Sequence, residues 1–293
     1  MRDQSGGRLS RRNLLLQAGA LGLAGCLPSG LSCPPARTGL QLYSIRQAMA
    51  VSVPQTLERV ARLGFGAVEF AGYFGHSPAE IATHLAATGL TAPSAHVDAR
   101  ASRADPARVV ADGARAGHRH LVVAWIPPED RTSLADWHAW ADSLNRLGEA
   151  CRAADLRCAY HNHDFEFRPI DGPPGEGGVT PWELLQARCD PSLVAFEIDT
   201  YWVQHAGLDP AELVARAPDR FPLCHLKDRA ADGSMAILGE GETDFAAVLA
   251  ARGPNGFEQC YAELDNPVSP FGFAATAEAA LSGILQANQT CPA

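Results

Sequence analysis

The sequence predicts an α/β protein, a single (β/α)8 TIM barrel preceded by an export signal. From Gly39 onward, eight short apolar runs alternate with eight helical patterns, which is typical of consecutive βα units. The chain has 293 residues, somewhat more than the roughly 250 of such a barrel, and the surplus lies at the N-terminus. Strict alternation favours a closed barrel over an open doubly wound sheet and indicates no second domain.

The N-terminal segment has the pattern of an export signal. Arg11 and Arg12 precede an apolar, small-residue stretch that ends in Leu-Ala-Gly-Cys26, and this stretch is too short to span a membrane. The arginine pair resembles a twin-arginine signal, and the stretch ending at Cys26 resembles a lipobox. We expect a signal over residues 1–26, a tether over 27–38 and a barrel domain over 39–293. The predicted location is the periplasm, with a lipid anchor at Cys26 as the one membrane contact.

The elements of the barrel follow from hydrophobic periodicity and from capping residues. Strands are expected at residues 39–44, 66–70, 90–96, 120–125, 156–161, 193–199, 221–226 and 258–264. Helices are expected at residues 54–63, 78–88, 105–116, 132–154, 181–188, 209–217, 244–252 and 274–287. Ser77-Pro78 and Asp209-Pro210 have the cap and proline of a helix start, and Gly64 and Gly89 follow helix ends. The irregular stretch 168–180 predicts an active-site loop.

Charge and cysteine content restrict the partners. The formal net charge is −9, and removal of the arginine-rich signal would make the chain more acidic, which argues against nucleic acid as a ligand.

The cysteines show no metal-binding or redox pattern, because the sequence contains no CxxC spacing. Cys158, Cys224 and Cys260 lie inside apolar strand runs and are expected to be buried free thiols. Cys33 and Cys291 flank the barrel and could be bridged.

Four successive strands in the second half end in residues that can bind a metal. These residues are His161, Asp199, His225 and Glu263, separated by 38, 26 and 38 positions. Each step is about one strand-plus-helix unit, and a closed barrel brings all four ends to one face. Two imidazoles and two carboxylates suit one divalent ion such as Mn²⁺, Co²⁺ or Zn²⁺. Burying them without a cation or a polar ligand would be costly.

Side-chain alternation adds two candidates to this face. His163 points the same way as His161, and Lys227 points the same way as His225. Beside a metal the pKa of Lys227 should fall, so that it could polarise a carbonyl or transfer a proton. The alternative is a structural lysine paired with Asp228 or Glu197.

The first three strands complete the rim of the expected site. They end in Tyr43, Glu69 and His96, which are expected to contact the substrate, with barrel packing as the alternative for each. Trp202 follows Asp199 by three positions and is expected to form an apolar wall for a sugar. Ordinary packing is expected for Trp125, Trp137 and Trp140.

One glycine-rich segment could be mistaken for a phosphate loop. Gly239–Asp244 reads GEGETD, which lacks the Lys-Ser/Thr pair of a Walker motif and does not stand in a Rossmann context. We interpret it as a structural turn, with Asp244 near the start of the following helix.

Together, the motifs YHNHDFEF, EIDTYW, HLKD, GEGETDF and YAELDN resemble those of the xylose isomerase-like TIM barrels, the sugar phosphate isomerase/epimerase superfamily, over residues 39–287. The resemblance implies one divalent metal held at the positions of His161, Asp199, His225 and Glu263. Many relatives have Glu-Asn-His where this chain has His161-Asn162-His163. The departure removes one of the two carboxylates that epimerases use as a proton-transfer pair, and Glu166 is a candidate replacement from the loop.

The resulting hypothesis is metal-dependent proton abstraction next to a carbonyl, through an enediolate. Glu263 is the expected base, with Lys227 or His163 as the partner acid. The outcome would be isomerisation, epimerisation, dehydration or elimination. Export favours a free sugar, a keto-sugar or a glycoside as substrate, and elimination or hydrolysis of a 3-keto-glycoside is one option.

Three other functions are alternatives to this hypothesis. The main alternative is a non-catalytic sugar-binding lipoprotein on the same barrel. A metal-dependent nuclease of the endonuclease four type would need more metal ligands and a less acidic chain. A purely structural envelope protein would not explain the four ligand-type residues at strand ends.

Overall fold

Eight parallel strands close into a barrel in the computed structural model of the protein, which describes residues 38–170 and 178–288. The strands are β1 (Gly39–Gln41), β2 (Ala67–Ala71), β3 (Thr91–Val97), β4 (His120–Val123), β5 (Arg157–His161), β6 (Val194–Asp199), β7 (Leu223–Leu226) and β10 (Gln259–Ala262). Their order around the barrel is β1-β10-β7-β6-β5-β4-β3-β2. The predicted (β/α)8 class is confirmed.

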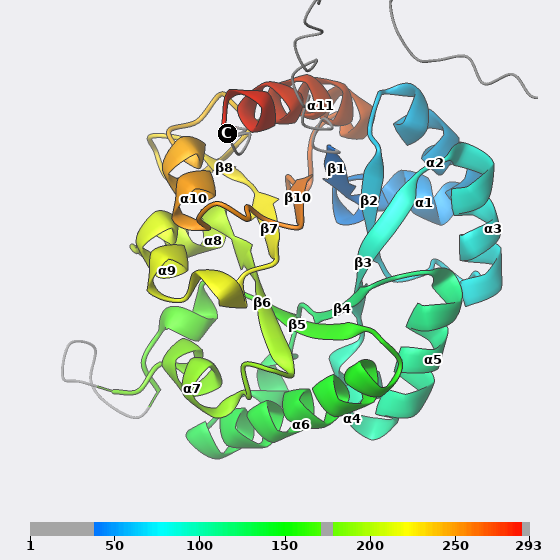
Figure 1. The fold of residues 1–293 in the computed structure, drawn as a ribbon. Helices are drawn as coiled ribbons and strands as arrows, with labels where there is room; N and C mark the ends of the chain where they lie inside the picture. The colour runs from blue at the N-terminus through cyan, green and yellow to red at the C-terminus, as the bar shows by residue number, and fades with distance from the viewer. Residues whose placement is uncertain (1–37, 171–177, 289–293) are drawn as a thin grey trace, which may run out of the picture. The chain divides into compact units, whose positions relative to one another are not determined.

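The helices surround the strands as an outer ring (Figure 1). They are α1 (Arg46–Val51), α2 (Val53–Arg62), α3 (Pro78–Thr88), α4 (Ala99–Ala104), α5 (Pro106–Ala116), α6 (Leu134–Ala153), α7 (Pro181–Arg188), α8 (Thr200–His205), α9 (Pro210–Arg216), α10 (Phe245–Ala251) and α11 (Pro270–Ala287). Short 3-10 helices cover Leu42–Ile45, Pro128–Asp130, Phe165–Phe167 and Pro218–Arg220, and β8 (Asp228–Arg229) pairs with β9 (Met235–Ala236). Within the described ranges, no helix combines the length and apolarity needed to cross a membrane.

The main departures from the expected elements are at β1, at α11 and at three short helices. β1 ends at Gln41 rather than at residue 44, because the Gln41 side chain accepts a hydrogen bond from the Tyr43 N–H and starts a 3-10 helix. α11 starts at Pro270, four residues early, because Ser269 caps it. Three helices not expected from the sequence are α1, α4 and α8, which have only six residues each.

The barrel interior changes from apolar to charged along its axis. One layer of the interior is a small apolar cluster made of Ala67, Val122, Ala159, Leu223 and Tyr261. Two residues farther along β2, β5, β7 and β10, the inward positions are Glu69, His161, His225 and Glu263. The alternation that builds the apolar layer therefore also places charged groups above it.

The glycine-rich segment has the structural role expected from the sequence. The Asp228 carboxylate accepts hydrogen bonds from the backbone N–H groups of Gly239, Gly241 and Thr243 at 2.9, 3.0 and 3.2 Å. Asp244 caps α10. Asp228 is therefore engaged with this turn and not with Lys227.

Several predictions concern segments beyond the described residues. The export signal, the tether up to residue 37, and the Cys33–Cys291 pair belong to this group, as do residues 171–177 of the expected active-site loop. Five cysteines can be assessed, and all are buried and unpaired, as expected for structural thiols: Cys151, Cys158, Cys189, Cys224 and Cys260.

Candidate metal centre and active-site pocket

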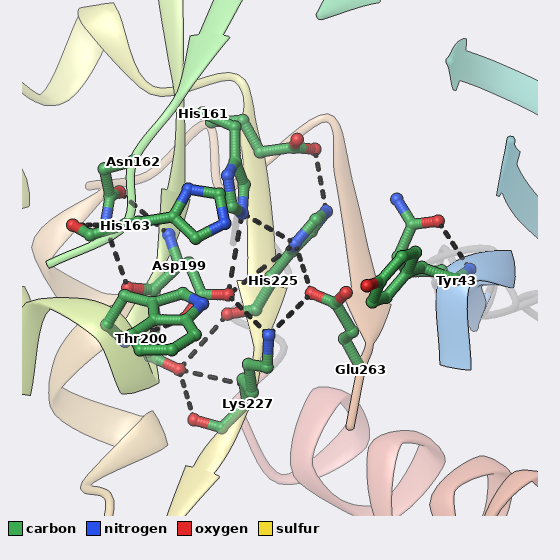
Figure 2. Close-up of polar contacts among 12 residues, drawn as sticks. Tyr43, His161, Asn162, His163, Asp199, Thr200, His225, Lys227 and Glu263 are labelled. Atoms are coloured by element: carbon green, nitrogen blue, oxygen red, sulfur yellow. Dashed lines mark hydrogen bonds and ion pairs between the residues drawn. The ribbon is translucent and has the colours of Figure 1, made fainter. Parts of the chain in front are cut away.

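The four residues proposed as metal ligands converge at the C-terminal end of the barrel. One ligand atom from each of His161, Asp199, His225 and Glu263 lies within 4.8 Å of all the others, and all four side chains are buried. The Nε2 of His161 lies 3.1 Å from the Nδ1 of His225 and 3.5 Å from the Oδ2 of Asp199, and the Oε2 of Glu263 lies 2.8 Å from the same Nδ1. Figure 2 shows these groups pointing toward one another.

Backbone contacts hold the ligand-bearing strand ends in place. Asp199 caps α8, so its Oδ1 accepts the Trp202 N–H at 2.9 Å while Oδ2 remains directed at the other ligands. The Asn162 carboxamide accepts the Asp199 N–H at 3.0 Å and links β5 to β6. The Thr200 hydroxyl accepts the Lys227 N–H at 3.0 Å and links β6 to β7. Capping thus leaves one oxygen of Asp199 available to a ligand.

Lys227 lies among carboxylates in this centre. Its Nζ is 2.8 Å from Asp265, 3.2 Å from Glu263 and 3.4 Å from Asp199. Burial disfavours the charged amine, but the three carboxylates outweigh burial and hold the pKa of Lys227 above its ordinary value. The expected fall of this pKa beside a bound metal stays a prediction, because the raised value belongs to the side chains without the cation's positive charge.

The donor set fits a divalent cation. The four nitrogen and oxygen separations among His161, Asp199, His225 and Glu263 run from 2.8 to 3.9 Å and bracket the edge of about 3.4 Å of a tetrahedron with bonds of about 2.1 Å. Among the described residues, Asp199 Oδ2 is fully buried and accepts no hydrogen bond, and the Lys227 ammonium lies 3.4 Å from it. Such an atom is costly unless a cation or a substrate group reaches it.

A cavity of about 770 Å³ opens above the metal-ligand cluster. The proposed site residues Tyr43, His96, His161, His163, Trp202, Lys227 and Glu263 line it. Arg168, from the expected active-site loop, also lines the cavity, and further lining residues that were not expected at the site are Ala124, Trp125, Arg131, Asp164, Phe165 and Asp265. The cavity thus has a charged inner end and a largely aromatic wall.

Two residues expected to contact substrate do not line this cavity. Glu69 is 0% exposed and lies beneath it, hydrogen-bonded to other side chains of the barrel interior. Glu166 is also fully buried; it accepts hydrogen bonds from the Tyr160 hydroxyl at 2.7 Å and from the His163 N–H at 2.8 Å. Burial raises the pKa of Glu166 to about 7. Glu166 therefore supports the loop after β5 and does not reach the cavity, so its expected role as a replacement carboxylate gains no support from this geometry.

Ordinary packing is the expectation for Trp125, but this residue lies on the cavity wall and is 48% exposed. Its ring centroid is 5.1 Å from that of His163 and 5.4 Å from that of Phe165, in edge-to-face contacts. The Arg131 guanidinium lies 3.3 Å from the Phe165 ring centroid, and Arg131 makes no ion pair within the described part of the chain. Trp137 and Trp140 are buried, as expected.

The imidazole of His163 completes the aromatic wall. It stacks on Phe165 with an interplanar angle of 12°. Burial, with a further contribution from His161, lowers the pKa of His163 well below its ordinary value. The imidazole that faces the cavity is therefore neutral. Of the two residues considered as the partner acid, His163 and Lys227, only Lys227 is a charged proton donor.

Catalytic groups at the C-terminal ends of barrel strands define a broad class of (β/α)8 enzymes. A family model described as xylose isomerase-like TIM barrel matches residues 57–262, and the chain belongs to this family. It is similar to an inosose dehydratase from Geobacillus kaustophilus, with 25% identity over 238 residues that cover 67% of this chain and 74% of that protein.

Solved structures share the same fold. A sugar phosphate isomerase/epimerase from Parabacteroides distasonis superposes with a TM-score of 0.74 and 24% identity, covering 86% of this chain and 95% of that one. A structure of the IOLI protein with a bound zinc atom superposes with a TM-score of 0.67 and 12% identity, covering 87% and 100%. At these identities the likeness establishes the fold alone.

Proposed function

We propose that this protein is a divalent-metal-dependent enzyme that abstracts a proton next to the carbonyl of a sugar. The observation that carries the proposal is the convergence of His161, Asp199, His225 and Glu263 at the floor of a large cavity. A bound cation would supply positive charge beside the sugar carbonyl and stabilise the enediolate that forms when the proton leaves. The inosose dehydratase and isomerase/epimerase relatives are consistent with this class of reaction.

Glu263 is the proposed base. Burial disfavours its charge, but Lys227 and His225 hold its pKa well below the ordinary value, so the carboxylate is ionised and able to accept a proton. Lys227 is the proposed electrophilic partner, because a buried ammonium in the cavity can donate a hydrogen bond to an oxygen that gains negative charge. A symmetric transfer between two carboxylates is not proposed, because His161 occupies the first of those positions.

The proposed substrate is a free sugar, a keto-sugar or a glycoside. Trp125, Phe165 and Trp202 offer flat apolar surfaces along the cavity, and aromatic faces of this kind pack against the C–H groups of sugar rings. A cavity of about 770 Å³ is also large enough for a substrate with more than one ring. These features support carbohydrate specificity and are compatible with either elimination or isomerisation.

A test of the proposal begins with metal analysis of the purified protein. We expect one divalent cation per chain and turnover of at least one keto-sugar or 3-keto-glycoside that stops on chelation. The matched variants Asp199→Asn and Asp265→Asn separate loss of a metal ligand from loss of a nearby negative charge, because only Asp199 belongs to the ligand cluster. Equal metal content in both variants would contradict the assigned ligands.

The alternative is a sugar-binding protein without catalysis on the same barrel. The same cavity and aromatic wall would serve that function. Bound metal together with saturable sugar binding, and no turnover in a screen of free, keto- and glycosidic sugars, would favour it over the enzyme.

We also propose that the protein is exported through the twin-arginine route and can be lipidated at Cys26. The support is the sequence of residues 1–26, which lies outside the described residues. Replacing Arg11 and Arg12 with lysine should retain the precursor in the cytoplasm, and Cys26→Ala should release a soluble periplasmic form. Normal export of the double-lysine variant would instead indicate the general secretory route.

A further inference from the structure

The His225 ring joins two clusters that lie one above the other. Its Nδ1 faces the proposed metal ligands, 2.8 Å from Glu263 and 3.1 Å from His161. Its Nε2 faces the other way and lies 2.7 Å from the Oε2 of Glu69 and 3.3 Å from the Oε1 of Glu197. Glu69 and His225 are both completely buried. An imidazole that binds a metal through Nδ1 must carry its proton on Nε2, and a hydrogen-bond acceptor at Nε2 selects that tautomer.

Glu69 is held rigidly in the position of that acceptor. Gln41 on the preceding strand donates to its Oε2 at 2.5 Å, and the Ser94 hydroxyl on the following strand donates to its Oε1. The ring nitrogen Nε2 of His96 lies 3.1 Å from Oε2. Since groups on both flanking strands hold the carboxylate, it cannot turn upward into the cavity. The carboxylate remains beneath His225 whether or not a ligand is bound above.

We propose that Glu69 is a positioning residue for the metal centre. It fixes the tautomer and the ring orientation of His225, so that the Nδ1 lone pair points at the site shared with His161, Asp199 and Glu263. The inference rests on the proposed metal-dependent function. It gives Glu69 a role in place of the substrate contact expected from the sequence.

A competing interpretation is a second metal site in the lower cluster. Glu69, His96, Glu197 and His225 also place one ligand atom each within 4.8 Å of one another. The hydrogen bonds already present argue against it, because Glu69 Oε2 accepts from both Gln41 and His225. Two cations would also require both nitrogens of His225 to be deprotonated. The geometry therefore favours one cation above His225 and a hydrogen-bonded carboxylate below it.

Glu69→Gln tests the proposal, with Glu166→Gln as the matched control. Both glutamates are fully buried, but Glu166 contacts Tyr160 and the His163 backbone and touches none of the four ligands. We expect Glu69→Gln to weaken Zn²⁺ and Co²⁺ affinity by about 10- to 100-fold, the usual effect of losing such a support, and Glu166→Gln to leave it within about threefold of wild type. Activity of Glu69→Gln should recover at saturating metal.

The outcomes separate this inference from the proposed function. Unchanged affinity in Glu69→Gln, or an equal loss in Glu166→Gln, would overturn the positioning role while leaving the metal enzyme intact. Two cations per wild-type chain, falling to one in Glu69→Gln, would make Glu69 a ligand. A wild-type protein that binds no divalent cation would refute both. Ser94→Ala, which frees one oxygen of Glu69 without touching His225, is the milder variant if Glu69→Gln does not fold, and we expect it to weaken affinity less.

Discussion

Replacement of Lys227 by methionine should tighten metal binding and reduce turnover at the same time. The Lys227 Nζ lies 3.2 Å from Glu263 and 3.4 Å from Asp199, the two carboxylates proposed to bind the cation. Unit charges at this separation interact by about 5 kcal/mol at an effective dielectric constant of 20. Because the ammonium and the cation compete for the same oxygens, loss of the ammonium should raise cation affinity by about tenfold or more.

The same change has a cost for the metal-free protein and for the reaction. Removing one partner from a buried ion pair costs about 3–5 kcal/mol, so the metal-free variant should unfold at lower denaturant concentration, and added metal should recover part of the loss. Turnover at saturating metal should fall by about 100-fold or more, the scale of a positioned acid–base group. The affinity is measured by calorimetric titration with Zn²⁺, and turnover by a keto-sugar assay.

Asp265→Asn is the control for this experiment. Asp265 is the nearest partner of Lys227, at 2.8 Å, but it does not belong to the ligand cluster. Its replacement should change metal affinity less than Lys227→Met does. Weaker metal binding in Lys227→Met would refute the competition argument, and full turnover would remove Lys227 from the chemistry.

Further predictions concern pH dependence and the cavity wall. Burial opposes the charge on His225, but Glu197 and Glu263 raise its pKa well above the ordinary value. Cation binding should therefore release about one proton, and cation affinity should rise by up to about tenfold per pH unit through the neutral range. An affinity that does not change with pH would contradict this prediction, as would a binding enthalpy that is the same in buffers of different ionisation enthalpy. The raised pKa of Glu166, about 7 against 4.5, stabilises the fold below pH 4.5, and this stability is lost as the pH rises to 7. Relative to Glu166→Gln, the wild type should lose about 3 kcal/mol of unfolding free energy between pH 4.5 and 7. If the unfolding free energies of the two proteins change in parallel with pH, the raised pKa of Glu166 is refuted. Trp125→Ala should raise KM for a glycosidic substrate by about tenfold or more with kcat and metal content unchanged, whereas a loss confined to kcat would indicate a role in the chemistry.

The metal-ligand cluster was predictable from the sequence because side-chain alternation sets which residues point inward and closure of consecutive βα units brings the strand ends to one face. The inward positions of a strand alternate, so His161 and Glu263 had to point inward if Ala159 and Tyr261 did. The depth of Glu69 was not predictable in the same way. The stagger between neighbouring strands pairs Glu69 with Gln41 and Ser94, and it places Glu69 one layer below the cavity. His96, two residues beyond Ser94 on the same strand, does reach the cavity.

Exposure and charge state depend on contacts between distant segments. Trp125 follows an apolar strand and looks like a core residue, but His163 and Phe165 support it at the cavity wall. The pKa of Lys227 depends on Asp199, Glu263 and Asp265, which come from different parts of the chain. Their distances to one amine cannot be read from spacing. Alternation and barrel closure indicate only that all three side chains point inward.

Proton exchange with solvent is the most direct test of the central proposal. Metal-loaded wild-type protein should incorporate deuterium from D₂O into a keto-sugar or 3-keto-glycoside at the carbon next to the carbonyl, as detected by NMR. Exchange should stop on chelation and in Glu263→Gln reloaded with metal, provided that this variant still binds the cation. Absence of exchange on every such substrate, in protein that carries one cation per chain, would contradict an enediolate mechanism and favour a sugar-binding protein.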